Sequence, residues 1–215
     1  MDDSSIDAAG ALADPLRRRL YEYVADSGGE VSRGEAAEAL GIRRTLAAHH
    51  LDRLEEAGLL EVERRRVNGR EGPGAGRPAK LYRRAGHQLS LHLPPREYEL
   101  AAHVLAEAVE RHGAEEAVHA AAREEGRRLG AGSGAGSVEE LLRERGYEPE
   151  EAGDDVRMRN CPFHTLARAF PPLACGLNLE LLRGMLEGLG EDGDRARMAP
   201  RTEGCCVAVS KNKIR

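Results

Sequence analysis

The sequence predicts an α+β protein, and three features of the chain support this class. Residues 41–60 repeat apolar side chains at the helical period, and Gly58 then ends the predicted helix. Residues 61–84 have the pattern of a hairpin rich in arginine and glycine. Beyond residue 137, stretches with helical periodicity mix with stretches that alternate like strands. Helices and strands are therefore expected at both ends of the chain.

Residues 41–60 form the best-defined element, an amphipathic helix with an abrupt end. Gly58 closes it, because glycine readily adopts the left-handed conformation found after a helix C-terminus. The opposite face carries polar and small side chains. The apolar stripe, at spacing i, i+4, i+7 and i+10, consists of Ala47, Leu51, Leu54 and Ala57.

A second short helix precedes this one. Ser32 and Glu35 have the spacing of a capping box, in which each side chain accepts a hydrogen bond from a backbone N–H at the start of the helix. Gly41 then supplies a tight turn. The two helices therefore have helix–turn–helix spacing.

The remaining N-terminal elements complete a small domain. Residues 1–13 have low hydrophobicity, and we expect them to be frayed. Asp14–Pro15 predicts the start of the first helix, with an N-cap followed by proline. Residues 61–84 predict an antiparallel hairpin, with Val31 pairing to it as a short edge strand. This order of elements predicts a winged helix–turn–helix over residues 1–85.

The predicted domain resembles the winged helix–turn–helix of ArsR-type bacterial regulators. Leu40–Ile42, His50–Leu51, Leu54 and Ala57–Leu59 carry the resemblance, which extends over about residues 14–84. Arg43 departs from the family, which usually has a capping Ser or Thr there, and the missing cap costs about 1 kcal/mol of helix stability. The resemblance implies a transcriptional regulator that binds a double-stranded DNA operator as a homodimer.

Positive charge is concentrated in the predicted hairpin although the formal net charge of the chain is −5. Residues 64–84 carry eight basic side chains and one acidic one, as expected where phosphates bind. The alternative is a basic loop without a partner. We expect the hairpin tip to order on DNA, with its Gly-Arg-Pro arginine entering a minor groove.

Candidate DNA-binding residues lie on the exposed face of the second helix and on the hairpin. We expect Arg44, Thr45 and His49 to reach base edges, whereas Arg43 and Arg53 contact phosphates. The full candidate set is Arg43, Arg44, Thr45, Ala48, His49, Arg53, Arg66, Arg70, Arg77 and Lys80.

Two further helices are predicted at about 96–111 and 115–129, where small and apolar residues form wide stripes. Because small residues allow helices to approach closely, we interpret residues 86–131 as a helical dimerisation segment. Packing within one chain is the alternative. The glycine-rich linker 130–136 then leads to a third unit, a small α+β domain over residues 137–215.

The third unit begins with a second capping-box pattern, formed by Ser137 and Glu140. Its further elements follow from periodicity and alternation. We expect helices at 137–145, 162–170 and 178–189, and strands at 156–160, 195–198 and 206–210.

All four cysteines lie in this third unit. Cys161 precedes a proline at a predicted helix start, and Cys175 stands just before the next predicted helix. Helix N-termini lower the pKa of a thiol and favour the thiolate that binds metals. Cys205 and Cys206 are predicted strand neighbours that point to opposite faces, so one of them should join the other two thiols. We favour Cys205, which shares its face with two valines, and keep Cys206 in reserve.

The cysteine pattern resembles the C-terminal domain of SufR-type regulators, which are ArsR-related repressors of iron–sulfur cluster assembly. Asn160–His164, Cys175 and the late Gly-Cys-Cys carry this resemblance. It implies that Cys161, Cys175 and Cys205 hold an iron–sulfur cluster, 4Fe–4S by expectation, whose fourth iron has a non-cysteine ligand or an exchangeable one. Zinc, with His164 as a further ligand, is one alternative. A metal-free thiol sensor or structural core is another.

Composition limits the remaining classes. The 215 residues are 40% hydrophobic and 32% charged, with 3% aromatic residues and no Trp, so the cores must consist of Leu, Ala and Val. An acidic N-terminus and the lack of a long apolar run predict a cytoplasmic protein without a membrane segment. Four cysteines in that compartment favour metal or redox chemistry over disulfides.

Two other function classes stay open. A regulator could sense a small organic ligand in an apolar pocket of the third unit. A thiol-dependent enzyme domain could instead be fused to the DNA-binding domain, with His164 beside Cys161. No catalytic order of His, Cys and Asp is visible, so we expect a protein that is not an enzyme.

Overall fold

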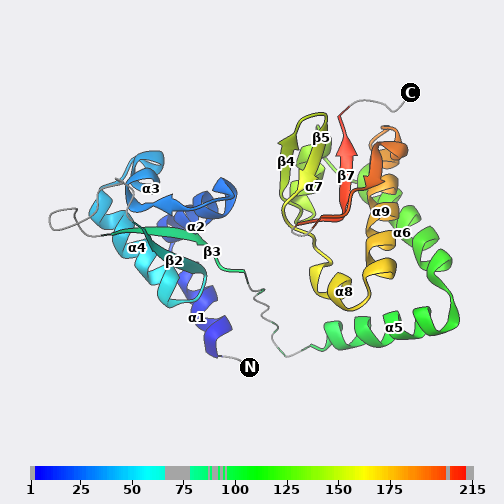
Figure 1. The fold of residues 1–215 in the computed structure, drawn as a ribbon, viewed down its shortest axis with the longest axis horizontal. Coiled ribbons are helices and arrows are strands. Elements are labelled where there is room, and N and C mark those ends of the chain that lie inside the picture. Colours follow the sequence, from blue (N-terminus) through cyan, green and yellow to red (C-terminus); the bar gives the residue numbers. More distant parts are fainter. Residues whose placement is uncertain are drawn as a thin grey trace. The chain divides into compact units, whose positions relative to one another are not determined.

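The structure is a computed structural model that describes residues 3–65, 78–86, 88, 92, 94, 96–201 and 204–211. The chain forms two compact units, Met1–Arg96 and Glu97–Arg215, each with its own core (Figure 1). Within the described ranges, no helix combines the length and the apolar character needed to cross a membrane.

The first unit is a winged helix–turn–helix, as predicted. Its three strands form an antiparallel sheet in the order β1-β3-β2, in which β2 and β3 are the wing (Figure 1). In chain order its described elements are α1 (Asp3–Ala11), α2 (Pro15–Ser27), β1 (Val31–Ser32), α3 (Arg33–Leu40), α4 (Arg44–Glu56), β2 (Leu60–Arg65) and β3 (Ala79–Arg84).

Side-chain caps start two helices of this unit at the predicted residues. The Asp14 carboxylate accepts hydrogen bonds from the backbone N–H groups of Leu16 and Arg17, both at 2.9 Å. At the start of α3, Ser32 and Glu35 form the complete capping box, with bonds of 2.8 and 3.2 Å. These bonds satisfy N–H groups that have no partner inside the helix.

The recognition helix α4 begins without a side-chain cap and ends sharply. Arg43 occupies the N-cap position and makes no capping hydrogen bond, as its side chain predicts. At the other end Gly58 adopts a φ of 72°, and the backbone N–H of Leu59 donates to the Leu54 carbonyl at 2.9 Å. This is the glycine-dependent helix end expected from the sequence.

The predicted apolar stripe of α4 forms the centre of the first core. Ala47, Leu51 and Leu54 are fully buried together with Leu20 of α2, and Ala57 is half-buried. The burial of this stripe fixes which face of α4 points outward.

The expectation of a frayed N-terminus is wrong for the described residues. Residues 3–11 form the helix α1, in which Ala8 and Ala11 are buried against the first core. Their small side chains contribute little to hydrophobicity, yet they fit closely against α4. Tertiary packing stabilises this helix despite its weak sequence signal.

The second unit is the α+β region predicted near the C-terminus. Its strands form an antiparallel sheet in the order β4-β5-β7-β6, and α9 and α7 contribute to the core on one face (Figure 1). Its described elements are α5 (Tyr98–His112), α6 (Glu115–Ala131), α7 (Val138–Glu144), β4 (Pro149–Ala152), β5 (Asp155–Met158), α8 (His164–Ala169), α9 (Pro171–Gly188), the 3-10 turn η1 (Gly193–Arg195), β6 (Ala196–Met198) and β7 (Val207–Ser210).

Helices α6 and α9 pack side by side at backbone contact (Figure 1). A Cβ added to Gly126 of α6 would lie 2.2 Å from the Leu181 carbonyl oxygen, and one added to Gly184 of α9 would lie 2.0 Å from the Arg123 carbonyl oxygen. Gly130 and Gly188 are similarly close to the opposite backbone. The two helices therefore require glycine at their contact.

This contact changes the division of the chain. The predicted boundaries were 1–85, 86–131 and 137–215, but α6 belongs to the core of the second unit, and α5 packs on α8 and α9. Residues 130–136 connect α6 to α7 within one unit. The glycines of the predicted linker include Gly130, which serves helix packing.

Three elements of the second unit differ from the sequence expectation. Helix α9 begins at Pro171, seven residues before the predicted start at 178, so Cys175 lies inside it. Strand β7 begins at Val207, so Cys205 and Cys206 precede it in a turn after Gly204. Strand β4 was not predicted, because its sequence PEEA has low strand propensity.

We expect Gly184→Ala to lower the free energy of unfolding of the second unit by about 2 kcal/mol or more, because its Cβ would overlap the α6 backbone. Urea unfolding followed by circular dichroism measures the change. Gly134→Ala is the matched control, since a Cβ there meets no atom within 4 Å. Equal stability of both variants would contradict the close backbone contact.

Candidate functional site

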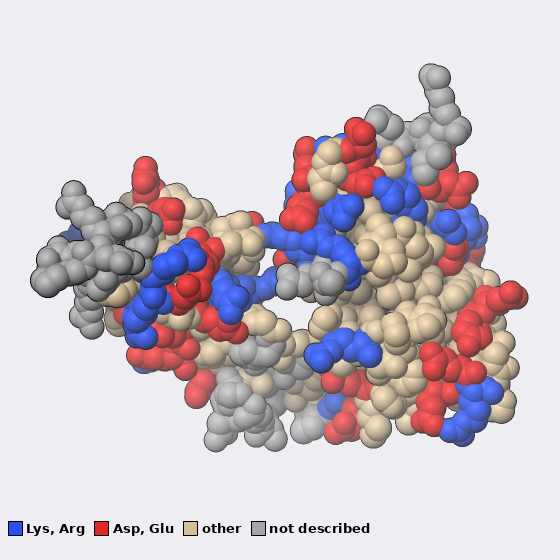
Figure 2. Space-filling model, viewed as in Figure 1, with Lys and Arg blue, Asp and Glu red and all other residues tan. Residues whose placement is uncertain are grey.

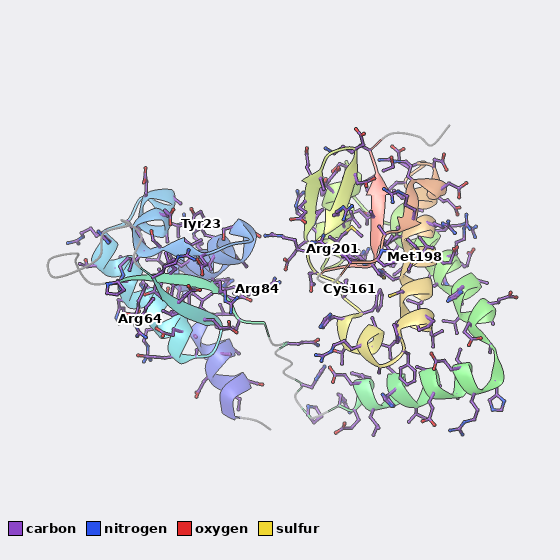
Figure 3. All side chains as sticks on the ribbon, in the orientation of Figure 1. Tyr23, Arg64, Arg84, Cys161, Met198 and Arg201 are labelled. Atoms are coloured by element: carbon purple, nitrogen blue, oxygen red, sulfur yellow. The ribbon has the colours of Figure 1, made fainter. Side chains whose placement is uncertain are left out.

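The first candidate site is a groove in the winged helix–turn–helix. It has a volume of about 690 Å³ and lies between the start of α3, the first half of α4 and both wing strands. Three arginines line it, Arg33, Arg44 and Arg64, and Arg64 extends from β2 (Figure 3). A concave surface lined by guanidinium groups attracts anions such as phosphates.

An ion-pair network joins α4 to the wing on one side of this groove. The Lys80 ammonium of β3 donates to Asp52 and to Glu55, both at 2.8 Å. The buried Tyr82 donates its hydroxyl to the same Asp52 carboxylate at 2.6 Å. The network holds the recognition helix and the wing at a fixed separation.

The network shifts the pKa values of its members. Burial alone would raise the pKa of Asp52, but the hydrogen bonds from Lys80 and Tyr82 outweigh it and lower that pKa. The hydrogen bonds that Lys80 donates to the carboxylates of Asp52 and Glu55 raise the pKa of Lys80. Burial, followed by the bond to Asp52, raises the pKa of Tyr82. Asp52 and Lys80 therefore stay ionised as a pair.

Lys80 has a structural role in this network, and its predicted contact with DNA stays a prediction. Two carboxylates already neutralise its ammonium, so the cation stabilises the α4–wing geometry. The sequence showed Lys80 only as one cation in a basic hairpin. Its acidic partners lie more than twenty residues earlier in the chain and come close only in the fold.

The structure places the other predicted DNA contacts that it describes on the outer face of α4. Arg44, Thr45 and Ala48 line the groove, and His49 is exposed beside them. Arg43 is also exposed, at the N-cap. Arg53, Arg66, Arg70 and Arg77 complete the predicted set: Arg53 is exposed and paired with Glu56, and the other three lie outside the described residues.

Arg33 is a groove residue that sequence reasoning missed. It is the first residue of α3, directly after the N-cap Ser32, and it faces Asp52 of α4 closely enough to help lower the pKa of that carboxyl. Basic and acidic side chains otherwise alternate in small groups over the face shown in Figure 2. The position of Arg33 at a helix start opposite the wing is the signal that could have identified it.

The second candidate site is the cysteine cluster, formed by Cys161, Cys175, Cys205 and Cys206. Cys161 lies where the chain leaves β5 and approaches α8 (Figure 3). Its thiol hydrogen-bonds with Cys205, Cys205 also bonds with Cys206, and Cys206 bonds with Cys175. Three separate chain segments thus bring four free thiols into one connected row.

The centre of the row is the buried Cys205. The side-chain amide of Asn178, fully buried in α9, donates to the Cys205 sulfur at 3.1 Å. The Asn178 carbonyl in turn accepts the Tyr147 hydroxyl at 2.5 Å, which fixes the orientation of the amide. The thiols of Cys161 and Cys206 also donate to Cys205. The charged form of this sulfur is therefore surrounded by donors.

These contacts separate the thiols in acidity. Hydrogen bonds from Cys161 and Cys206 outweigh burial and lower the pKa of Cys205. The bond to Cys205, together with burial, raises the pKa values of Cys161 and Cys206. Burial raises the pKa of the neighbouring Tyr147 hydroxyl. Cys205 is therefore the cysteine of these three that forms a thiolate most readily, and the thiols of Cys161 and Cys206 act as its donors.

One prediction about the cluster needs correction. Cys206 was expected to point away, because strand neighbours face opposite sides, but Cys205 and Cys206 lie in a turn, and Cys206 contacts both Cys205 and Cys175. The turn removes the alternation on which this prediction depended. His164, the reserve ligand, has an exposed side chain whereas the neighbouring Cys161 is buried, and its role as a ligand stays a prediction.

The thiol set suits a soft metal or a cluster. Sulfur ligands select zinc, copper(I) and iron–sulfur groups over oxygen-preferring ions. Among the residues that the structure describes, no three His, Cys, Asp or Glu side chains already surround a common metal position. The thiols instead contact one another in pairs.

Helix α5 carries the third feature, an exposed apolar face. Leu100, Val104 and Leu105 are 59%, 56% and 66% exposed. The opposite face of α5 packs on other helices of the second unit, where Ala106 is buried against Phe170. An apolar helix face this exposed is typical of a surface that a protein partner covers.

Asp52→Asn should lower the free energy of unfolding by about 1 kcal/mol at neutral pH, because the Lys80 and Tyr82 bonds lose a charged acceptor. The folded pKa of Asp52 lies below its usual 3.8, so the stabilisation is complete above that pH and is lost as the pH falls through the folded-state value. The difference between wild type and variant should therefore shrink below pH 3.8.

Urea unfolding from pH 7 to pH 3 measures this difference. Glu38→Gln is the control, because Glu38 is an exposed carboxylate on α3 outside the network. A pH dependence of Asp52→Asn identical to that of wild type would contradict the stabilising role of the ion pair.

Comparisons with known proteins bear on the first unit. Residues 12–63 match the family described as helix-turn-helix domain. The solution NMR structure of a homodimeric winged helix-turn-helix DNA-binding domain from Mycobacterium bovis, a possible ArsR-family transcriptional regulator, is 30% identical, with a TM-score of 0.30. That match covers 39% of this chain and 66% of the other. Among curated proteins, none matches. The N-terminal unit is thus a winged helix–turn–helix domain that matches the helix-turn-helix family.

Proposed function

We propose that this protein is a cytoplasmic, homodimeric transcriptional regulator whose affinity for a double-stranded DNA operator depends on an iron–sulfur cluster bound by its cysteine cluster. The observation that carries the proposal is the pairing of two sites in one chain. A helix–turn–helix with an arginine-lined groove occupies one unit, and a row of four thiols occupies the other.

DNA binding is supported by the geometry of the groove. The outer face of α4 presents Arg44, Thr45 and His49, and a helix of this kind enters the major groove. Arg33 and Arg64 line the same groove from α3 and β2 and can contact phosphates. The Lys80 network sets the spacing between helix and wing, so both can contact the same DNA segment.

Dimerisation is supported by the exposed face of α5. Leu100, Val104 and Leu105 would be covered by the same face of a second copy, as in an isologous interface. Helix–turn–helix dimers bind two half-sites, so the separation of the two α4 helices determines operator affinity. The proposal requires that a change in α5 alters that separation.

The cysteine cluster fits the proposed cofactor. An iron–sulfur cluster takes thiolate ligands, and the structure brings Cys161, Cys205, Cys206 and Cys175 together. When bound, the cluster supplies reversible one-electron and oxygen-sensitive chemistry. The resemblance of the cysteine pattern to SufR-type regulators favours an iron–sulfur cluster over zinc, which the same thiols could hold.

The proposed coupling runs along α9. This helix carries Cys175 and, two residues earlier, Leu173, which packs with Phe170 against α5. A ligand that repositions Cys175 therefore acts on the helix that supports the proposed dimer surface. Coupling of this kind typically changes affinity by about 1–3 kcal/mol.

Arg44→Ala should weaken binding by about 1–3 kcal/mol and relax specificity at one base pair, because a bidentate base contact is lost. The operator is selected from random duplex DNA by the wild-type chain, and binding is measured by titration at fixed salt. Arg168→Ala, an exposed arginine of α8, is the control. A uniform loss on all sequences would assign Arg44 to the DNA backbone.

Single Ser substitutions at Cys161, Cys175 and Cys205 should remove most of the bound iron, because the remaining ligands cannot complete the site. Cys206→Ser should also reduce it, since that thiol contacts two others. Iron, zinc and sulfide content and visible absorption are measured on chains purified without oxygen, alongside operator titration.

Each outcome of that experiment has a separate meaning. A colourless wild type that carries zinc would show that the site binds zinc in place of the proposed iron–sulfur cluster. A wild type that carries no metal would contradict metal sensing. Metal loss without any change in operator affinity would contradict the coupling and leave the cysteines a structural role.

A further inference from the structure

The four thiols of the cysteine cluster follow one another in a row. Cys205 contacts Cys161 on one side and Cys206 on the other. Cys206 in turn contacts Cys175, so Cys161 and Cys175 are the ends of the row. All four are free thiols. Thiols that already touch are those that oxidation can join with little movement of the backbone.

Backbone contacts hold Cys205 beside Cys161. The N–H of Cys205 donates to the carbonyl of Met158, three residues before Cys161, at 2.9 Å. Gly204, with a φ of 84°, allows this approach, because a Cβ there would lie 2.8 Å from the same carbonyl oxygen. Cys161 and Cys205 are both buried in the core of the second unit. The contact between these two thiols therefore agrees with the packing of the chain segments that carry them.

Helix α9 brings Cys175 to the same turn. The Asn178 amide donates to the Cys205 sulfur at 3.1 Å, so this side of α9 faces the turn. Cys175 precedes Asn178 by three residues, and residues three apart lie on the same face of a helix. Cys175 is therefore on the side of α9 that faces the turn, where its thiol bonds with Cys206.

Only one pairing of touching thiols uses all four cysteines. Cys205 and Cys206 are adjacent in the chain, with Cα atoms about 3.8 Å apart. Cα atoms joined by a disulfide are roughly 4.4–6.8 Å apart, so a bond between these neighbours is strained. The touching thiols that remain pair Cys161 with Cys205, and Cys175 with Cys206.

We propose that the cysteine cluster of the metal-free chain is a site of oxidation by peroxide, at which the disulfides Cys161–Cys205 and Cys175–Cys206 form. The inference goes beyond the proposed function, because it concerns the chain without a bound ligand. The two bonds would join the segment after β5, helix α9 and the turn before β7. Sulfur in a disulfide is no longer a thiolate, so the oxidised chain cannot bind metal through these four residues.

Each disulfide consumes one peroxide molecule. The thiolate of one cysteine attacks a peroxide oxygen, the O–O bond breaks, and the sulfur becomes a sulfenic acid. The departing hydroxide takes up the proton of that thiol and forms water. The partner thiol then attacks the sulfenic sulfur, the S–O bond breaks, and a second water leaves with the partner's proton. Cys175 and Cys206 are half-buried, so a small oxidant can reach this end of the row from solvent.

The test uses the full-length chain, purified with a chelator and a reductant, freed of both without oxygen, and treated with one hydrogen peroxide per expected disulfide. Remaining thiols are alkylated, and the chain is digested with trypsin without reductant for mass spectrometry. Trypsin gives peptides 160–168 and 169–183 with one cysteine each, and 202–211 with two. We expect all four thiols to be lost. Fragmentation between Cys205 and Cys206 should assign peptide 160–168 to Cys205 and peptide 169–183 to Cys206.

Two variants isolate the individual bonds. Cys206→Ser should retain the link between peptides 160–168 and 202–211 and leave Cys175 alkylated. Cys205→Ser should retain the link between peptides 169–183 and 202–211 and leave Cys161 alkylated. Wild type oxidised in denaturing urea is the control, in which the fold no longer selects the partners and mixed pairings should appear.

The peptide map of wild type decides by itself, even where a variant fails to fold. Crossed pairing, a bond between Cys205 and Cys206, or thiols that stay free overturns the inference. The same mixture of pairings with and without urea overturns it as well. Iron uptake by the reduced chain separates this inference from the proposed function. Iron binding with crossed disulfides would refute only the inference, whereas the expected disulfides without iron binding would refute only the iron–sulfur proposal.

Discussion

Helices α6 and α9 touch backbone to backbone, and the arrangement of the second unit depends on that contact. Gly126 and Gly184 leave no room for a Cβ, and Arg123 bridges the helices by pairing with Glu180 and Glu187 beside the glycines. Close contact of this kind fixes the rotation of α9 about its axis. That rotation determines which α9 residues face the sheet and which face α6.

The consequences for the cysteine cluster follow from the rotation of α9. Leu182 and Met185 point into the core with the sheet residues, and Asn178 reaches the Cys205 sulfur on the same side. Gly176 faces α6 and accepts the ring of His119. Helix α9 thus presents the Asn178 amide to the segment that carries Cys205, and Gly176 to α6.

In the first unit, a hydrogen-bonded ion-pair network fixes how a helix is positioned. Its recognition helix has an apolar stripe that fixes one face, but the distance from helix to wing depends on Lys80 between Asp52 and Glu55. The fully buried Tyr82 donates its hydroxyl to the Asp52 carboxylate. An exposed ion pair contributes little to stability, whereas this one is partly buried and hydrogen-bonded, which favours a single geometry.

Local signals in the sequence predicted the first unit well. Asp14, Ser32 with Glu35, and Gly58 act on backbone groups within a few residues, so their effect can be recognised without knowledge of the fold. The two-residue strand β1 and the antiparallel pairing of the wing strands also agree with expectation. The roles of the outward residues of α4 on DNA stay predictions.

Tertiary contacts account for what the sequence could not predict. Gly176 precedes the helix start predicted at 178, but it lies inside α9, where its missing side chain leaves room for the ring of His119. Cys206 looked like the wrong face of a strand, but Gly204, with a φ of 84°, makes a turn there. The partners of Lys80 are distant in sequence. In each case the deciding neighbour belongs to another element.

The cysteine cluster draws on three segments that are far apart along the chain. Cys161 follows β5, Cys175 lies in α9, and Cys205 and Cys206 precede the last described strand. A nascent chain therefore has only part of the thiol row until β7 has been synthesised and paired with β5. Any ligand that needs all three segments can enter only a completed and folded second unit, so its presence would distinguish mature chains from unfinished ones.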